Sequence, residues 1–471
     1  MNELYLSVAV LVCFANDNDA MIPELWSDIG LAILEENMVV ANLVNRSFEN
    51  DIKDFGDVVN TRRPAQRKGR RRTDADEYVE KDVTLTNVRV TLDQWFYDSF
   101  IIKDGEQTKS MADLIDMHLR PAMQSIARMV DRSVLGRVHA YLKTPTARVG
   151  RLGAISSSNA KDYVLDAREL LNIQKAPNDN RRLLLAPSAE TAMLKTDQFI
   201  SAEKRGDGGN ALEQARLGHI LGFDTFMGQN VNYINTTNVD TIAGTITNAL
   251  AAGGSGSQAS TVTAYEAIVG EFATVAGNDQ PSYITARTAS TNTTAVTMNE
   301  ANKHASGAGA VLTVYKACDV KGNFASGTST EITVDGHTAS KPPQVGQLIA
   351  FGTGTRHVYT VIESEVVSST ETKLLLDRPL EVLLTDGDKA FPGPAGSMNL
   401  AFNKDFLALV TRPLAIPAND LGVKAASSVY NNVSMRVVMQ YDSKKGGTRV
   451  NFDILAGVAV LDQDLGVVVL G

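Results

Sequence analysis

The sequence has few of the residues that most metal and redox sites need. Only two of its 471 residues are cysteine, Cys13 and Cys318, and six are histidine. Two cysteines so far apart match no zinc spacing and cannot form a disulfide framework, so we expect buried thiols in a reducing compartment. The histidines, at positions 118, 139, 219, 304, 337 and 357, include no pair spaced for a metal site on one helix. The sequence therefore predicts no metal site and no cofactor.

Long apolar runs are also missing. A membrane-spanning helix needs roughly 18 consecutive apolar residues, and the nearest candidate is the shorter stretch Leu4–Ala15. No Lys or Arg precedes it and no clear cleavage site follows it, so it is not typical of a signal peptide. We interpret it as a buried strand or short helix, or as an extension upstream of a natural start at Met21. We expect an intracellular protein without membrane contact.

Familiar catalytic motifs are absent as well. The chain has no phosphate-binding loop, zinc-protease, dinucleotide-binding or EF-hand motif. Ser158 and Lys161 have the S-x-x-K spacing in which a lysine can act as base for a serine nucleophile. The partner motifs of that chemistry are missing, and Ser156–Asn159 is more typical of a loop and helix cap. We predict no catalytic residue and no enzyme; an unrecognised hydrolase stays an alternative.

What the sequence does contain is the composition of a folded protein. Hydrophobic residues make up 44% and charged residues 21% of the chain, and its length predicts two to four domains. The net charge of −9 argues against a surface that binds nucleic acid all round, but it allows a local basic patch.

The first part of the chain alternates helical and strand signals. Residues 21–45 have the apolar spacing of a helix, with Pro23 in its first turn. Asp57–Asn60 and Val83–Leu92 show strand patterns on either side of a highly charged block. We expect them to be the two arms of a long excursion that carries this block at its tip.

The charged block is basic in its first half and acidic in its second half. Its cations and the acids that follow them are Arg62, Arg63, Arg67, Lys68, Arg70, Arg71, Arg72, Asp74, Asp76, Glu77, Glu80 and Asp82. Unpaired buried charge is too costly for a core, so the block must be exposed. It could bind a phosphate backbone, which makes a DNA-binding protein a second alternative, but it lacks aromatic residues for base stacking. A block of both signs is better suited to an oppositely charged neighbour, such as another copy of the chain; a plain solvated hairpin is the third possibility.

The longest helical signal follows. From Ser110 to about residue 141, apolar residues recur at helical spacing, and His118 falls among them as an expected core residue. Pro121 should bend or restart this helix, because proline removes a backbone donor and clashes with the preceding turn.

The rest of the chain predicts an α+β unit that is interrupted by β-structure. Residues 151–235 alternate helices such as Ala160–Ile173 with strands such as Arg181–Ser188. Residues 236–395 are rich in Thr, Ser, Gly and Val, with turn signals every ~8–12 residues, as in a small antiparallel sandwich or barrel. The α+β pattern resumes at about residue 399, so we interpret 236–395 as one β-domain inserted into a discontinuous parent.

Several segments, taken in order, resemble the major capsid proteins of tailed bacteriophages, which share the Hong Kong 97 fold. The chain is most similar to the short-tailed-phage coat proteins that carry an inserted β-barrel-like domain. The resemblance is carried by Ile22–Trp26, Val59–Pro64, Val83–Asp104, RLLLAPS, Leu217–Val231, NLAFNKDFLALVTRPL, MRVVMQYD and DILAGVAVL. These segments span most of residues 21–465.

The resemblance implies a structural role in a virion. It implies an α+β capsid fold with an N-terminal extension and arm (1–56), an extended loop with peripheral strands (57–105), a spine helix (106–150), an axial domain (151–235), the inserted β-domain (236–395) and a return to the axial and peripheral domains (396–471). Such proteins form hexamers and pentamers of themselves, assemble in the host cytoplasm with scaffolding and portal proteins, and enclose double-stranded DNA. Whether a decoration protein binds is left open. The charged residues Arg62–Glu80 would then contact a neighbouring subunit.

Overall fold

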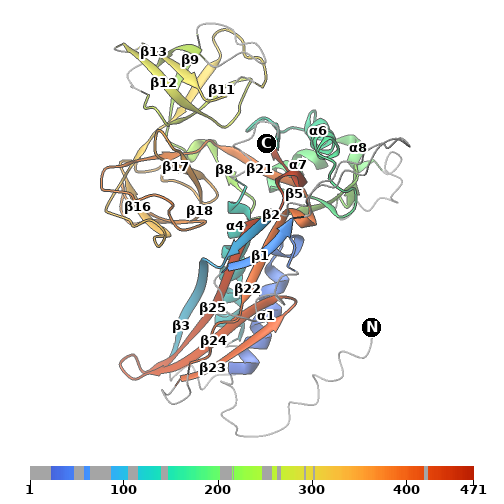
Figure 1. Cartoon of the computed structure of the whole chain (residues 1–471), viewed down its shortest axis with the longest axis vertical. Helices are drawn as coiled ribbons and strands as arrows, with labels where there is room; N and C mark the ends of the chain where they lie inside the picture. Colours follow the sequence, from blue (N-terminus) through green and yellow to red (C-terminus); the bar gives the residue numbers. More distant parts are fainter. Residues whose placement is uncertain are drawn as a thin grey trace, which may run out of the picture. The chain divides into compact units, whose positions relative to one another are not determined.

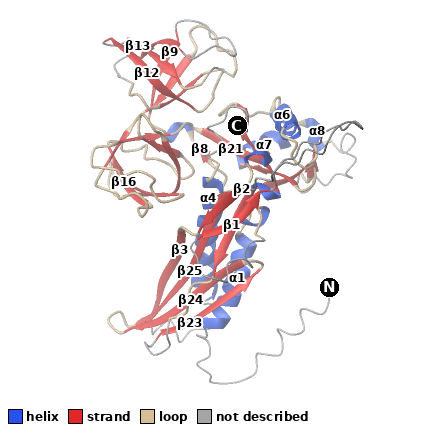
Figure 2. Cartoon of the chain, viewed as in Figure 1, coloured by secondary structure: helices blue, strands red, loops and turns tan. Residues whose placement is uncertain are grey.

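The structure is a computed structural model of the 471-residue chain. It describes residues 23–46, 58–63, 86–103, 115–138, 147–201, 215, 217–246, 257–262, 267–290, 293–300, 303–417 and 423–471. Helices and strands both occur, with strands in the majority, so the fold is mixed α+β (Figures 1 and 2). Two compact units are present: residues 1–38, 94–128 and 410–456 form unit 1, and residues 39–93, 129–409 and 457–471 form unit 2.

Unit 1 is a helix packed on an antiparallel sheet. The helix α1 (Pro23–Asn37) begins at the predicted proline and buries one stripe of residues, among them Trp26, Gly30 and Leu34. Gly30 marks a close approach of the helix to the sheet, because a Cβ there would lie 2.9 Å from Cε at the flexible end of Met435. The strands of the sheet are β3 (Gln94–Lys103), β22 (Leu407–Arg412), β23 (Val423–Tyr430), β24 (Val433–Asp442) and β25 (Gly447–Val460), in the order β22-β25-β24-β23, with β3 also paired to β25.

An aromatic cluster lies between α1 and this sheet. The Trp26 ring stacks on Phe452 at a centroid distance of 6.5 Å and lies 6.4 Å from Phe100. Phe100 in turn stacks on His118 at 5.3 Å. His118 is therefore packed against a half-buried ring and is itself half-buried, rather than fully buried as expected of a core residue.

The predicted spine helix changes its geometry beside Pro121. A π-helical turn, η4 (Ile115–Leu119), leads directly into α4 (Arg120–Gly136), so Pro121 is the second residue of the regular helix. The helix type therefore changes just before Pro121, but helical structure continues without a break through Arg120–Ala122, so the predicted restart is not found there. The predicted start at Ser110 and the end near residue 141 lie outside the described residues.

Unit 2 contains a seven-stranded mixed sheet. Its strands are β4 (Arg148–Gly150), β26 (Gly466–Leu470), β21 (Gly396–Asn403), β5 (Arg181–Leu185), β7 (Phe223–Met227) and β6 (His219–Ile220) in that order, with β8 (Tyr233–Ile234) paired to β21. The pairs β26–β4 and β5–β7 are parallel. Chain segments from before and after residues 236–395 therefore share one sheet.

Three helices accompany this sheet: α6 (Ala160–Ile173), α7 (Pro187–Leu194) and α8 (Asp197–Ile200). Helix α6 has the predicted bounds and buries Tyr163, Val164 and Leu171 against the core. It ends in a Schellman turn: Lys175 adopts φ 61°, and the Ala176 N–H donates to the Leu171 carbonyl over 2.9 Å.

The region predicted as one β-domain contains two closed six-stranded barrels. Barrel 1 consists of β9 (Thr241–Ile246), β10 (Ser257–Val262), β11 (Phe272–Val275), β12 (Ser282–Ser290), β13 (Thr293–Met298) and β14 (Val311–Tyr315). Barrel 2 consists of β15 (Cys318–Val320), β16 (Glu331–Asp335), β17 (Leu348–Phe351), β18 (His357–Val366), β19 (Thr372–Leu376) and β20 (Lys389–Pro392). Only two residues separate β14 from β15, so no linker signal marks the division in the sequence.

The two barrels have the same topology. Barrel 1 closes in the cyclic order β9-β10-β13-β12-β11-β14, and barrel 2 in the order β15-β16-β19-β18-β17-β20. Shifting each barrel 1 strand number by six gives the order of barrel 2. Equivalent strands also carry a register shift, between Ile284 and Ala286 in β12 and between Val361 and Glu363 in β18. The barrels are thus two copies of one module in tandem.

Candidate functional site

The arms of the predicted excursion pair as expected. Strand β1 (Val58–Arg63) and strand β2 (Thr86–Thr91) are antiparallel, with Val58 opposite Thr91 and Arg63 opposite Thr86. The excursion between them, residues 64–85, is 22 residues long. This segment lies outside the described residues.

Most of the predicted contact residues cannot be placed. Arg62 and Arg63 are the last two residues of β1. The remainder lie outside the described residues: Arg67, Lys68, Arg70, Arg71, Arg72, Asp74, Asp76, Glu77 and Glu80. Their role in contact between subunits stays a prediction.

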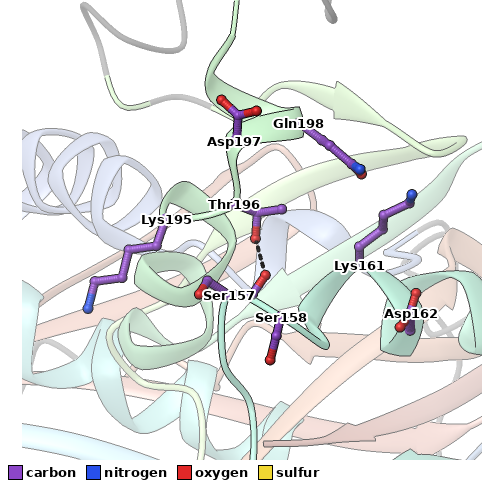
Figure 3. A pocket seen from close by; sticks show the side chains of 8 residues that line it. All are labelled: Ser157, Ser158, Lys161, Asp162, Lys195, Thr196, Asp197 and Gln198. Carbon is purple, nitrogen blue, oxygen red and sulfur yellow. Dashed lines mark hydrogen bonds between the residues drawn. The ribbon is translucent and has the colours of Figure 1, made fainter.

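Ser158 and Lys161 line a shared surface pocket but do not form a nucleophile–base pair. The pocket has a volume of about 400 Å³ and is also lined by Asp162, Lys195 and Thr196. Figure 3 shows the Ser158 and Lys161 side chains pointing away from each other. The Ser158 hydroxyl instead lies 2.9 Å from that of Ser156, ahead of α6. This geometry supports the interpretation as a loop and helix start, and it does not align the pair for acyl transfer.

Buried charge in unit 2 serves to join elements. Asp131 of α4 accepts hydrogen bonds from the backbone N–H groups of Val39 and Ala41, over 3.1 and 2.9 Å. Burial raises the pKa of this carboxyl to about 6, although those hydrogen bonds oppose the shift. Asp131 thereby satisfies the first donor of η2 (Ala41–Leu43), which has no side-chain cap of its own.

The end of α4 docks on barrel 2 through a polar network. The Thr360 hydroxyl donates to the Gly136 carbonyl over 2.9 Å, and the Thr360 N–H donates to buried Asp377. Arg137 lies between two carboxylates, 3.5 Å from Asp377 and 3.6 Å from Asp93. Groups on the helix, on barrel 2 and on the segment before β3 are therefore paired with one another.

Barrel 1 docks on the edge of the seven-stranded sheet through its β11–β12 hairpin. The Leu152 N–H donates to the Asp279 carbonyl over 3.0 Å, and Gln280 Nε2 donates to the Gly150 carbonyl over 2.8 Å. Buried Arg148 of β4 pairs with Glu300 from the segment after β13. Burial lowers the pKa of Arg148 to about 10, still far above neutrality, so the pair stays charged.

Barrel 2 docks on barrel 1 through the equivalent hairpin, β17–β18. Arg356 of this hairpin lies over the rings of Phe272 and Tyr283 of barrel 1, 4.2 Å from each centroid, and 5.6 Å from that of Phe391. Its guanidinium donates to the Gly270 carbonyl. Such stacking between aromatic rings holds a cation with little help from carboxylates. Each barrel therefore uses the same hairpin to dock on the element that precedes it.

Sequence reasoning did not identify these docking residues. Arg356 follows a glycine-rich turn and has no charged partner nearby in sequence, and its rings lie 73 and 84 residues upstream. Asp131 carried a weak signal, as an acid on an otherwise apolar helix stripe.

Among the described residues, no group of three or more His, Cys, Asp or Glu could hold a metal. None of the described helices is long and apolar enough to span a membrane.

No family model and no curated protein matches the chain. Solved structures do match it over most of its length. The chain is similar to phage capsid structures. The capsid structure of cyanophage P-SCSP1u aligns with a TM-score of 0.42 and 10% identity, over 88% of this chain and 84% of the other. The asymmetric unit of the bacteriophage PhiM1 mature capsid aligns with a TM-score of 0.38 and 9% identity, over 89% of this chain and 83% of the other. A structure from Mycobacterium phage Che8 aligns with a TM-score of 0.43 and 12% identity, over 92% of this chain and 90% of the other.

Proposed function

We propose that this chain is the major capsid protein of a tailed bacteriophage, built on the Hong Kong 97 fold. In this role it assembles with itself into hexamers and pentamers that close an icosahedral shell around double-stranded DNA. The observation that carries the proposal is the order of the elements along the chain. A paired two-stranded excursion (β1–β2) is followed by an edge strand, a long helix (α4), a mixed sheet with α6 and α7, a β-barrel region, and return strands that complete both sheets.

The sequence segments that resemble capsid proteins support this order. VNTRRP coincides with β1, RLLLAPS with β5 and the start of α7, and NLAFNKDFLALVTRPL with β21 and β22. β5 and β21 belong to the seven-stranded sheet, β22 belongs to the five-stranded sheet, and β1 belongs to the β1–β2 pair, so these segments lie mostly on strands rather than on loops.

Finer features of the capsid role belong to the same proposal. We expect peripheral and axial domains with the boundaries given above, assembly with scaffolding and portal proteins in the host cytoplasm, and a final location in the virion.

The charged block Arg62–Glu80 would act in this shell as a contact between subunits. Each exposed ion pair is worth only ~0.2–1 kcal/mol, so the block would act through its repetition over many copies. Arg70, Arg71 and Arg72 replaced by Ala should leave circular dichroism and melting temperature nearly unchanged, yet reduce the yield or salt resistance of closed particles. Particles of normal yield and salt resistance would identify the block as a solvated hairpin.

A DNA-binding role makes a different prediction. Filter binding of DNA by the unassembled chain would then be tight and would weaken steeply as salt rises. Weak binding that depends little on salt is the expected result for a capsid protein with a net charge of −9.

A further inference from the structure

Side chains of barrel 1, and not another strand, cover the outer edge of the seven-stranded sheet. Strand β4 is the last strand on this side, and among the described strands it pairs only with β26. The Arg148 carbonyl accepts a hydrogen bond from Lys303 Nζ. The Gly150 carbonyl accepts one from Gln280 Nε2 over 2.8 Å. Open edges pair with other chains, so barrel 1 protects this sheet while it stays docked. We call the contact the barrel 1 joint; it consists of residues 148–152, 278–280 and 303–304.

The His304 side chain is held within the barrel 1 joint. Asn278 Oδ1 accepts hydrogen bonds from the backbone N–H groups of Lys303 and His304, each over 3.0 Å, and so fixes this segment to the β11–β12 hairpin. The His304 ring also donates a hydrogen bond to the Gly150 carbonyl. Its Nε2 atom is buried, and no described residue supplies a hydrogen-bond partner for it. A proton added at Nε2 would therefore lie in the joint without an acceptor.

Charged groups from several elements face this ring. The cations are Lys303, adjacent in sequence, and Arg151, which follows β4. The acids are Asp279 of the hairpin and Asp166 of α6. Burial lowers the pKa of His304, and the two cations lower it further, against the opposing effects of its hydrogen bond and of Asp279. The docked joint therefore favours the neutral ring.

We propose that acid releases barrel 1 from strand β4, and that protonation of His304 causes the release. A protonated ring places a third positive charge beside Lys303 and Arg151, with a buried N–H that has no acceptor. Protonation therefore favours the state in which barrel 1 has left the sheet and the ring is in water. Release exposes the edge carbonyls of Arg148 and Gly150 for pairing with another strand. This release is a property of the single chain and does not depend on the proposed capsid function.

The pH range of the release follows from which state binds the proton more tightly. A histidine in water has a pKa of about 6.5, and the pKa of His304 is lower in the docked joint because of burial. Docking is therefore strongest above neutrality and weakens as the pH falls below about 6.5. Burial raises the pKa of Asp279 and Asp166, so protonation of these acids favours docking and opposes the release at lower pH. Arg148 is paired with Glu300 and, with a pKa of about 10, stays charged throughout.

Hydrogen–deuterium exchange of the Leu152 amide measures the release in the full unassembled chain, because this N–H donates to the Asp279 carbonyl across the joint over 3.0 Å. One titrating group changes an equilibrium by at most about tenfold per pH unit. We expect the protection of Leu152, corrected for the intrinsic pH dependence of exchange, to fall about three- to tenfold between about pH 7.5 and about pH 5.5. The Leu183 amide of interior strand β5 should keep its protection. Constant protection of Leu152 over this range would overturn the proposal.

Two histidine variants assign the effect to its residue. His304→Gln cannot take up the proton, so its Leu152 protection should not change with pH. His219→Gln is the matched control, because His219 is exposed on β6 at the opposite edge of the same sheet and should leave the wild-type fall intact. A wild-type fall in His304→Gln would contradict the proposal. If this variant does not dock at about pH 7.5, Lys303→Gln decides instead: it removes one cation facing the ring, so the fall should shrink about twofold or more, and an unchanged fall would contradict the proposal.

Discussion

The two barrels are built on one topology but differ in what stabilises them. The core of barrel 1 consists of aliphatic residues and Met298, whereas that of barrel 2 includes Phe351 and Tyr359, with ring centroids 5.7 Å apart. Residues 241–315 contain six charged side chains and residues 318–392 contain sixteen. The same barrel topology can thus be stabilised in two ways. Barrel 1 combines a core of small aliphatic side chains with docking contacts to its neighbours, and barrel 2 combines a core with aromatic rings and surface ion pairs.

The charges of barrel 2 are paired across neighbouring strands. Lys373 of β19 lies 2.6 Å from Glu331 of β16, and Lys389 pairs with Asp319. In barrel 1, by contrast, the described acids are used internally or at the docking site. Buried Glu271 accepts hydrogen bonds from the N–H groups of Ile268 and Ala317 over 2.8 and 2.9 Å. We infer that barrel 1 depends more on its neighbours and barrel 2 more on itself.

The largest expected effect comes from the core of barrel 2. Tyr359→Ala removes a fully buried ring together with the acceptor of the Glu381 N–H, at a cost of about 3–5 kcal/mol. Cys318 reports this change, because it is buried in barrel 2 and burial raises its thiol pKa to about 12. The measurement is the rate at which a thiol reagent labels Cys318, in a Cys13→Ser background so that only one thiol reacts. We expect Tyr359→Ala to raise this rate by about a hundredfold or more.

The matched change in barrel 1 is Leu312→Ala, which truncates another fully buried core residue. If the barrels open separately, it should leave Cys318 labelling within about threefold of wild type. Equal acceleration by both variants would mean that the barrels unfold as one unit and that the comparison is wrong.

The docking of barrel 2 on barrel 1 should have an intermediate effect. Stacked Arg–aromatic contacts contribute about 0.5–2 kcal/mol each when they are desolvated. With Cys318→Ala and a buried probe at Ala273→Cys in barrel 1, Arg356→Ala should speed labelling about tenfold. Arg356→Lys keeps the charge but not the planar stacking, so it should restore only part of the protection. Unchanged protection of the barrel 1 probe in Arg356→Ala would show that this contact does not stabilise barrel 1.

The smallest effect is expected from the surface ion pairs of barrel 2. Lys373 and Glu331 are about half exposed, so removing the pair should change stability by ~0.2–1 kcal/mol. Sodium chloride at ~1 M should reproduce this loss, since it screens exposed pairs. Cys318 labelling should therefore rise slightly with salt, and labelling of the barrel 1 probe should not. A larger salt effect on barrel 1 would reverse the proposed difference.

How far the sequence predicts this structure depends on how local the signals are. Helix α6 and the β1–β2 arms follow from periodicity and strand pattern over a few residues. The division into two barrels could not be predicted, because Tyr315 and Cys318 end and begin neighbouring strands without glycine or proline between them. Arg356 and the rings of Phe272 and Tyr283 were equally hidden, because the docking of barrel 2 on barrel 1 brings together residues that are more than 70 positions apart.

Negative-stain microscopy of the full chain, overexpressed alone and with the scaffolding protein of its phage, tests the capsid assignment most directly. The account predicts closed or partly closed shells of uniform curvature, with ring-shaped capsomers, that sediment far faster than a 50.7 kDa monomer. A homogeneous monomer under both conditions would contradict it.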